Sequence, residues 1–197
     1  MMDFQYRNTE PELMDKPNVP IDILRLVFRD INKSNRYLGG NAITLANVCK
    51  LIKLFPGKQY TIADMGCGDG EMLRQIAGHF RNKETEVVLI GLDLNENALT
   101  IARELSVDFP EITFLKQDIL ALKPQDFNCD ILLCTLTMHH FSNAQIPLFL
   151  SKFTKLAKIG IVINDLQRSC LLYTSPSPRD CGPDLVCRLL LEKKGGG

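Results

Sequence analysis

The stretch DMGCGDG, residues 64–70, decides the fold of this 197-residue chain. It lies between a short β-rich run, YTIADM, and a segment with helical spacing of apolar residues, EMLRQIAGHFRN. Glycines at every second position (Gly66, Gly68 and Gly70) allow a sharp turn, and they let a ligand approach the backbone closely. The stretch therefore predicts a strand–loop–helix unit whose loop faces a ligand, although ordinary strand–helix turns also use such loops.

Strand and helix patterns alternate after this loop. The segments EVVLIGLDL and CDILLCTLTM are nearly continuous apolar runs, as expected of strands buried on both faces. Further strands are expected at 112–119 and 160–166, and further helices at 96–109, capped by Asn95, and at 146–158, with Pro147 in the first turn. This alternation predicts an α/β fold, a parallel sheet with helices on both faces.

Two helices are expected before the loop, at 21–32 and at 41–55, separated by the break RYLGG. Asn41 is the expected N-cap of the second helix. Residues 1–20 contain three prolines and are expected to form a mobile arm. The predicted domain core is therefore 21–169.

The overall composition excludes several classes of protein. The chain has 23 basic and 23 acidic residues, so no net charge attracts it to nucleic acid. The opening residues lack the apolar run of a secretion signal, and no apolar run is long enough to span a membrane, so a cytoplasmic protein is expected. The cysteines upstream of residue 170 lack CxxC spacing, which favours incidental thiols and no metal site.

The last part of the chain, 170–197, is expected to be a non-native tail. CLLYTSPSPRD, which begins at Cys170, resembles one reading frame of a sequencing-library adapter, and DLVCRLLLE resembles the continuation of that adapter. The alternative is a Pro/Ser turn followed by a short amphipathic helix from Asp184 to Lys194.

Acidic residues around the glycine loop indicate which ligand it binds. The dinucleotide fingerprint GxGxxG places its third glycine where Glu71 stands here, and a pyrophosphate beside Glu71 and Asp69 is unfavourable. S-adenosylmethionine carries an ammonium and a sulfonium, so the nearby acids, including Asp64, suit it better.

Two more acids follow the next strands. Asp93, at the end of GLD, is placed to accept hydrogen bonds from both ribose hydroxyls of an adenosine ligand; its alternative role is to cap a helix. Asp118 could accept from the adenine amino group while Ile119 covers the ring; alternatively, Asp118 is a solvent-facing turn residue.

The ordered motifs DMGCGDG, GLDLN, KQDI and CTLTMHHF resemble those of class I S-adenosylmethionine-dependent methyltransferases, in particular the small-molecule branch that includes quinone-biosynthesis enzymes. The resemblance covers about Ile21 to Ser169. It implies a Rossmann-like sheet with strand order 3-2-1-4-5, of which the family's final strands 6 and 7 are missing here. It also implies a cofactor site, to which we assign Asp64, Gly66, Cys67, Gly68, Asp93, Leu94, Asp118, Ile119 and Thr135.

Methyl transfer needs an aligned nucleophile and, for some acceptors, a group that takes a proton. His139 and His140 follow the fourth strand, and His140 is our candidate for that base; the alternative is that both histidines only shape the pocket. The expected function is O- or C-methylation of a small molecule. The alternatives are a nicotinamide-dependent oxidoreductase and an inactive methyltransferase fragment.

Overall fold

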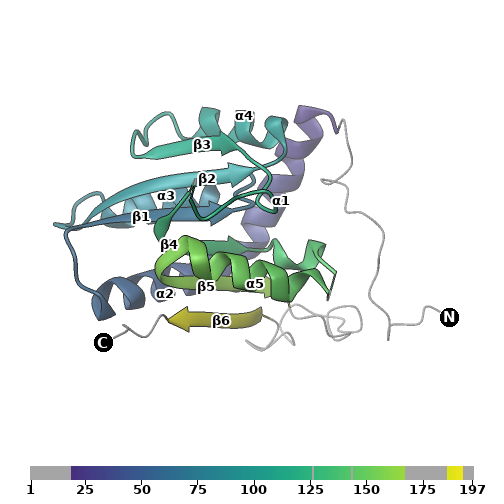
Figure 1. Cartoon of the computed structure of the whole chain (residues 1–197). Helices are drawn as coiled ribbons and strands as arrows, with labels where there is room; N and C mark the ends of the chain where they lie inside the picture. The colour runs from purple at the N-terminus through teal and green to yellow at the C-terminus, as the bar shows by residue number, and fades with distance from the viewer. Residues whose placement is uncertain (1–18, 126, 143, 167–185, 193–197) are drawn as a thin grey trace.

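A computed structural model describes residues 19–125, 127–142, 144–166 and 186–192. These residues form a six-stranded sheet with the order β3-β2-β1-β4-β5-β6 (Figure 1). The strands are β1 (Gln59–Met65), β2 (Glu86–Asp93), β3 (Ile112–Lys116), β4 (Cys129–Thr135), β5 (Ala157–Leu166) and β6 (Val186–Glu192). Strands β1 to β5 are parallel, which confirms the predicted α/β class and the order 3-2-1-4-5.

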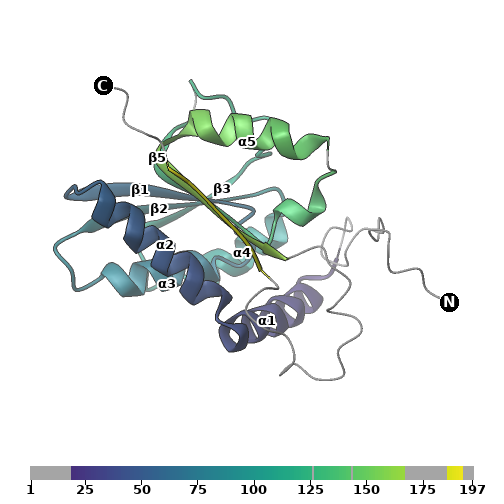
Figure 2. The same ribbon diagram turned by 90° about the horizontal axis from the view of Figure 1, so that it is seen from below.

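Helices cover both faces of the sheet. Figure 2 shows α5 on one face and α1 to α4 on the other. The helices are α1 (Ile21–Leu38), α2 (Gly40–Leu54), α3 (Glu71–Phe80), α4 (Glu96–Leu105) and α5 (Gln145–Leu156), with a short 3-10 turn, η2 (Met138–His140), after β4. Pro147 lies in the first turn of α5, where its missing N–H costs no hydrogen bond.

The strands are apolar on both sides because each face of the sheet has its own core. Neighbouring residues such as Leu132 and Leu133 belong to opposite cores, since successive side chains of a strand alternate. One core joins the sheet to α2, α3 and α4, and the other joins it to Phe149 and Phe153 of α5. The continuous apolar runs seen in the sequence are thereby explained.

The helix boundaries differ from the prediction at several places: the helices expected at 96–109 and 146–158 end at Leu105 and Leu156. Helix α1 continues to Leu38 and is followed by Gly39, which has a φ of 75°. The left-handed backbone at Gly39 therefore separates the helices. Asn41 was expected to cap α2, but it lies inside the helix and is buried, so that prediction was wrong. Asn95 does cap α4, because its side chain accepts from the N–H groups of Asn97 and Ala98.

The end of the predicted N-terminal arm packs on the domain. Val19 is buried in a small cluster with Leu24 and Phe28 of α1 and with Ala98 and Ile101 of α4. The N–H of the Asn97 amide also donates to the Val19 carbonyl, at 3.3 Å. Residues 1–18 lie outside the described part of the chain, so the rest of the arm stays a prediction.

The sheet also has a strand that we did not predict. β6 pairs antiparallel with β5 along residues 160–166, so its backbone satisfies groups that β5 would otherwise present at an open edge. Residues 186–192 are a strand, so the alternative of a helix from Asp184 to Lys194 was wrong. Residues 167–185 and 193–197 lie outside the described residues, and the non-native origin of the tail stays a prediction.

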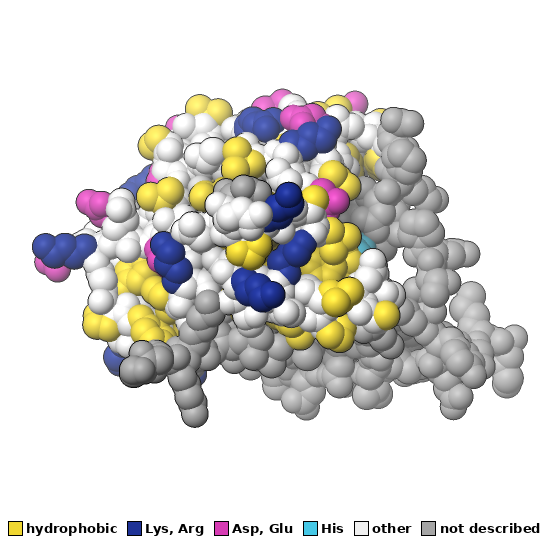
Figure 3. Space-filling model, viewed as in Figure 1, with side chains coloured by type: hydrophobic (Ala, Val, Ile, Leu, Met, Phe, Trp, Pro, Cys, Tyr) yellow, Lys and Arg dark blue, Asp and Glu magenta, His cyan; other side chains and the backbone are white. Residues whose placement is uncertain are grey.

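Two surface properties bear on the expected partners. On the face shown in Figure 3, basic side chains are interspersed with acidic and hydrophobic ones. Among the described helices, none combines the length and the apolar character needed to cross a membrane.

Candidate functional site

A cleft of about 450 Å³ lies at the carboxyl ends of β1 to β4. Ligands of open α/β sheets bind at this edge. Helix α1 lies at the end of the sheet toward which β2 and β3 point (Figure 1), and it contributes Phe28, Ile31 and Asn32 to the lining. The cleft brings together every predicted site residue: Asp64, Gly66, Cys67, Gly68, Asp93, Leu94, Asp118, Ile119, Thr135 and His140.

The glycine loop has a backbone that other residues would strain. Gly66, Gly68 and Gly70 have φ values of 77°, 54° and 76°. A Cβ on Gly66 would stand 2.6 Å from the Thr137 hydroxyl, and one on Gly70 would stand 2.7 Å from the Phe114 ring. Glycine is therefore required by the protein's own packing as well as by the turn.

Asp93 faces the glycine loop. Its Oδ2 accepts a 2.9 Å hydrogen bond from the Gly68 N–H, and its Oδ1 accepts a 2.8 Å hydrogen bond from the Asn95 N–H. The carboxylate therefore holds the loop and the residue before α4, whereas the cap of α4 is the Asn95 side chain, so the capping alternative for Asp93 was wrong. A carboxylate can accept about four hydrogen bonds, so these two contacts do not by themselves exclude hydroxyl groups of a ligand.

Asp64, the last residue but one of β1, has an unusual carboxyl group. Its side chain is buried, and its Oδ1 has no hydrogen-bond partner among the described residues. Burial and the neighbouring charge of Asp93 raise the pKa of Asp64 to about 7. A buried acceptor without a donor is costly, and a cationic ligand would relieve that cost.

The remaining predicted residues differ in their surroundings. Asp118 accepts a 2.8 Å hydrogen bond from the Leu120 N–H in the turn after β3, so it also has the turn role. Ile119 is buried at the cleft wall, whereas Leu94 is 64% exposed. The Thr135 hydroxyl is buried and lacks a partner in the described part of the chain. Cys134, the residue before Thr135, packs in the core beneath α5.

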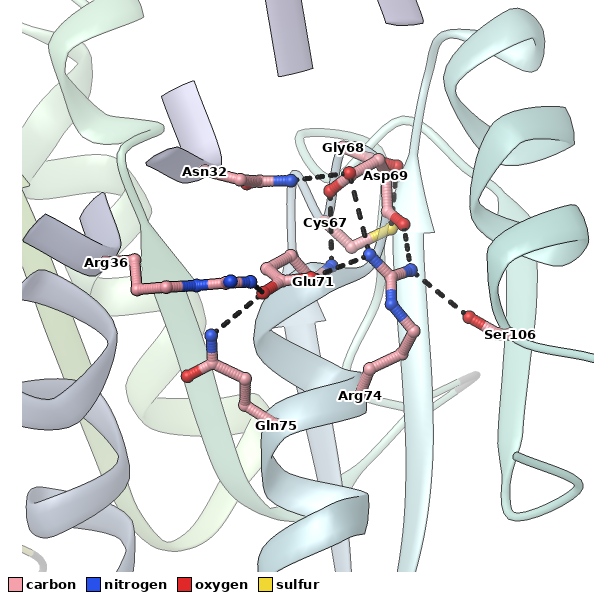
Figure 4. A network of polar contacts seen from close by, with 9 residues as sticks. All are labelled: Asn32, Arg36, Cys67, Gly68, Asp69, Glu71, Arg74, Gln75 and Ser106. Carbon is pink, nitrogen blue, oxygen red and sulfur yellow. Dashed lines mark hydrogen bonds and ion pairs between the residues drawn. The ribbon is translucent and has the colours of Figure 1, made fainter. Parts of the chain in front are cut away.

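A polar network joins the glycine loop to α1 and α3 (Figure 4). The Asn32 amide donates to Asp69 at 2.7 Å, and the Arg74 guanidinium donates to the Asp69 carbonyl. Arg74, Gln75 and Arg36 bind the Glu71 carboxylate. Although burial raises the pKa of Glu71, these hydrogen bonds and the Arg74 charge lower it more. Glu71 therefore keeps a negative charge at the start of α3, where a pyrophosphate would have to sit.

His139 makes a contact that the sequence did not reveal. Its Nδ1 lies 2.6 Å from Asp165 Oδ1, and its backbone N–H donates to Asp165 Oδ2 at 2.9 Å. Asp165 is in β5, 26 residues later, and the only sequence signal was its place at the end of a predicted strand. His140 also lines the cleft, and its role as the base stays a prediction.

Comparison with known proteins identifies the family. Residues 62–160, just over half of the chain, match the family profile described as "Methyltransferase domain". The chain belongs to this methyltransferase family. The matched region contains the glycine loop, Asp93, Asp118, Thr135 and both histidines of η2, but it ends before Asp165.

Relatives of this methyltransferase-family chain agree with the assignment. It is 26% identical over 155 residues to the ubiquinone/menaquinone biosynthesis C-methyltransferase UbiE of Campylobacter jejuni. That match covers 76% of this chain and 64% of the relative, so the chain spans less than two thirds of the relative's length.

Two solved structures share the fold. The plantazolicin methyltransferase BpumL in complex with SAH has a TM-score of 0.59 and 23% identity, over 81% of this chain and 60% of that one. Magnesium protoporphyrin IX methyltransferase from Synechocystis, with bound SAH, has a TM-score of 0.58 and 18% identity, over 76% of this chain and 68% of that one.

Proposed function

We propose that this chain binds S-adenosylmethionine in the cleft and transfers its methyl group to a small-molecule acceptor, at oxygen or carbon. The observation that carries the proposal is the buried Asp64 carboxyl, which lines the cleft beside the glycine loop. Its Oδ1 receives no hydrogen bond from any residue that the structure describes. The amino-acid part of the cofactor has an ammonium, which supplies both the missing donors and the opposite charge.

The residues around Asp64 suit the rest of that cofactor. Asp93, held between Gly68 and Asn95, accepts from the ribose hydroxyls. Asp118 accepts from the adenine amino group, and Ile119 and Leu94 cover the adenine ring. The tight turn at Gly66 and Gly68, together with Cys67, brings the backbone to the methionine part, and Thr135 lines the wall beside it.

Methyl transfer requires few chemical steps of the protein itself. When bound, S-adenosylmethionine supplies a methyl group on a sulfonium that is already a good leaving group. The chain has to align an acceptor with that methyl group and exclude water from the cleft. Phe28, Ile31 and Phe141 line the cleft, and their apolar surfaces serve that exclusion. His140, which we predicted as a base, lines it too.

A small-molecule acceptor is favoured over nucleic acid by the balanced charge of the chain, and a cytoplasmic location belongs to the same proposal. Two of the similar proteins have names that fit a small-molecule acceptor. The Campylobacter protein is named for ubiquinone and menaquinone biosynthesis, and the Synechocystis enzyme for magnesium protoporphyrin IX.

Calorimetric titration tests the proposal against the two alternatives. We expect SAH and S-adenosylmethionine to bind one to one, and NADH to give no signal because Glu71 remains ionised. Binding of NADH without binding of SAH would establish the oxidoreductase alternative. A chain that shows no cooperative melting transition and binds neither would establish the inactive fragment.

A further inference from the structure

We propose that His139, held by Asp165, takes a proton from a hydroxyl-bearing acceptor in the cleft. This assignment rests on the proposed function and narrows it from oxygen or carbon to an O–H acceptor of the phenol class. It also moves the base from His140, our prediction from sequence, to the preceding residue.

The first step of the argument is the geometry of the pair. Asp165 accepts from both the Nδ1 side of the His139 ring and the His139 backbone N–H, at 2.6 and 2.9 Å. Because the carboxylate offers only acceptors to Nδ1, the neutral ring keeps its proton on Nδ1. Nε2 is then the nitrogen that carries a lone pair and can accept a proton.

The second step is the burial of the pair. The side chains of His139 and Asp165 are 16% and 7% exposed, and His139 lines the cleft. An imidazolium formed there would be stabilised by a carboxylate that water screens poorly. The ring of His140 is a neighbour, with its centroid 4.1 Å away, and the Asp165 carboxylate contacts His139 at Nδ1.

The third step is the fixed position of the ring relative to the glycine loop. Leu136, just after β4, has a φ of 52°, and its N–H donates to the Asn164 carbonyl at 2.8 Å. The Asn164 amide in turn donates to Gly40 and Thr44 of α2. The Thr137 hydroxyl oxygen lies 3.4 Å from the Gly66 carbonyl oxygen. The turn that carries His139 is therefore tied to β5, to α2 and to the loop beside Asp64.

The fourth step is the character of the neighbouring cleft wall. Phe28, Ile31, Leu136 and Phe141 line the cleft together with His139. Apolar side chains that share a cleft with His139 suit a flat aromatic acceptor with an ionisable hydroxyl. Asp165 is a positioning residue in this scheme, because it acts through His139.

The reaction step balances as follows. The acceptor oxygen forms a bond to the methyl carbon, and the carbon–sulfur bond breaks with its electron pair staying on sulfur. The hydroxyl proton moves to Nε2 of His139. The products are a methyl ether, a neutral thioether and an imidazolium paired with Asp165, which afterwards releases its proton to solvent.

The experiment uses the full chain loaded with SAH, with 4-nitrophenol as the probe because its phenolate is visible by absorbance. Nitrogen-15 NMR of the three histidines reports their tautomers without any acceptor. We expect His139 to carry its proton on Nδ1, and we expect bound 4-nitrophenol to ionise at a pH where the free phenol is protonated. H139Q should abolish this ionisation, and D165N should reduce it about tenfold or more, since an opposite charge at this range shifts protonation by one to three powers of ten.

Separate outcomes identify which part has failed. Absence of SAH binding contradicts the proposed function itself. If SAH binds but His139 carries its proton on Nε2, the role of Asp165 is wrong. If H140Q abolishes phenolate formation while H139Q retains it, His140 is the base. If the SAH-loaded protein leaves saturating 4-nitrophenol protonated, the hydroxyl-acceptor assignment is overturned.

Discussion

Replacement of Asp64 by Asn should make the protein more stable at high pH while abolishing cofactor binding. Burial and the Asp93 charge raise the pKa of Asp64 from 3.8 to about 7 in the folded chain. The folded state therefore holds a proton that the unfolded state has lost, so the free energy of unfolding falls as pH rises through this range. Asn has the shape of the protonated acid and carries no charge, so D64N removes this dependence.

The expected size follows from the shift. Three pKa units correspond to about 4 kcal/mol, fully expressed above about pH 7. Part of the loss in the wild-type free energy of unfolding is already present at about pH 5. The difference in free energy of unfolding between D64N and the wild type should therefore grow by about 3 kcal/mol between about pH 5 and pH 8. Equilibrium urea unfolding of both proteins at the two pH values measures it, because titrating groups that do not interact with Asp64 contribute equally to both proteins and cancel in the difference.

The matched control is D108N, which alters an exposed carboxylate on the loop after α4. Its effect should stay within about 0.5 kcal/mol at both pH values, as for most surface substitutions. A D64N effect that does not change with pH, or that destabilises more at high pH, would refute the reasoning. SAH binding by D64N with wild-type affinity would refute the role of Asp64 in the site.

Three further predictions follow from the same structure. SAH affinity should fall about tenfold per pH unit below about pH 7, because a proton then competes with the ligand ammonium for Asp64. Calorimetric titration at several pH values measures this, and an affinity that does not change with pH would contradict it. G66A should destabilise the protein by about 2 kcal/mol or more, because its Cβ would stand 2.6 Å from Thr137 on a left-handed backbone. G78A places its Cβ in open space within α3 and should stabilise the protein by about 0.5–1 kcal/mol. Thermal unfolding of the two variants compares these effects. N95A should cost about 1 kcal/mol through loss of the α4 cap, and no loss in chemical unfolding would contradict the capping role.

The sequence predicted the parts of the site that consist of short local motifs. The glycine loop and Asp93 could be placed because each stands at the carboxyl end of an apolar run, and parallel strands bring those ends to one edge. Their joint position could also be predicted because β1 and β2 are neighbours in the sheet. The hydrogen bond from Gly68 to Asp93 is the direct result of that arrangement.

The contacts that depend on packing between distant elements could not be predicted. The pairing of His139 with Asp165 requires the register in which Thr135 lies opposite Asn164 across β4 and β5. The approach of Asn32 to Asp69 likewise depends on how α1 lies across the loop. Asn41 has the residue type of a cap, but the left-handed Gly39 begins the helix earlier and leaves Asn41 buried. Residue type alone does not distinguish these cases.

Backbone NMR of the nitrogen-15-labelled chain during titration with SAH tests the location of the cofactor site most directly. We predict that the largest amide shifts fall on Gly66, Gly68, Leu94 and Ile119, which line one cleft. Shifts confined to residues outside that cleft, with these four amides unchanged at saturation, would contradict the account.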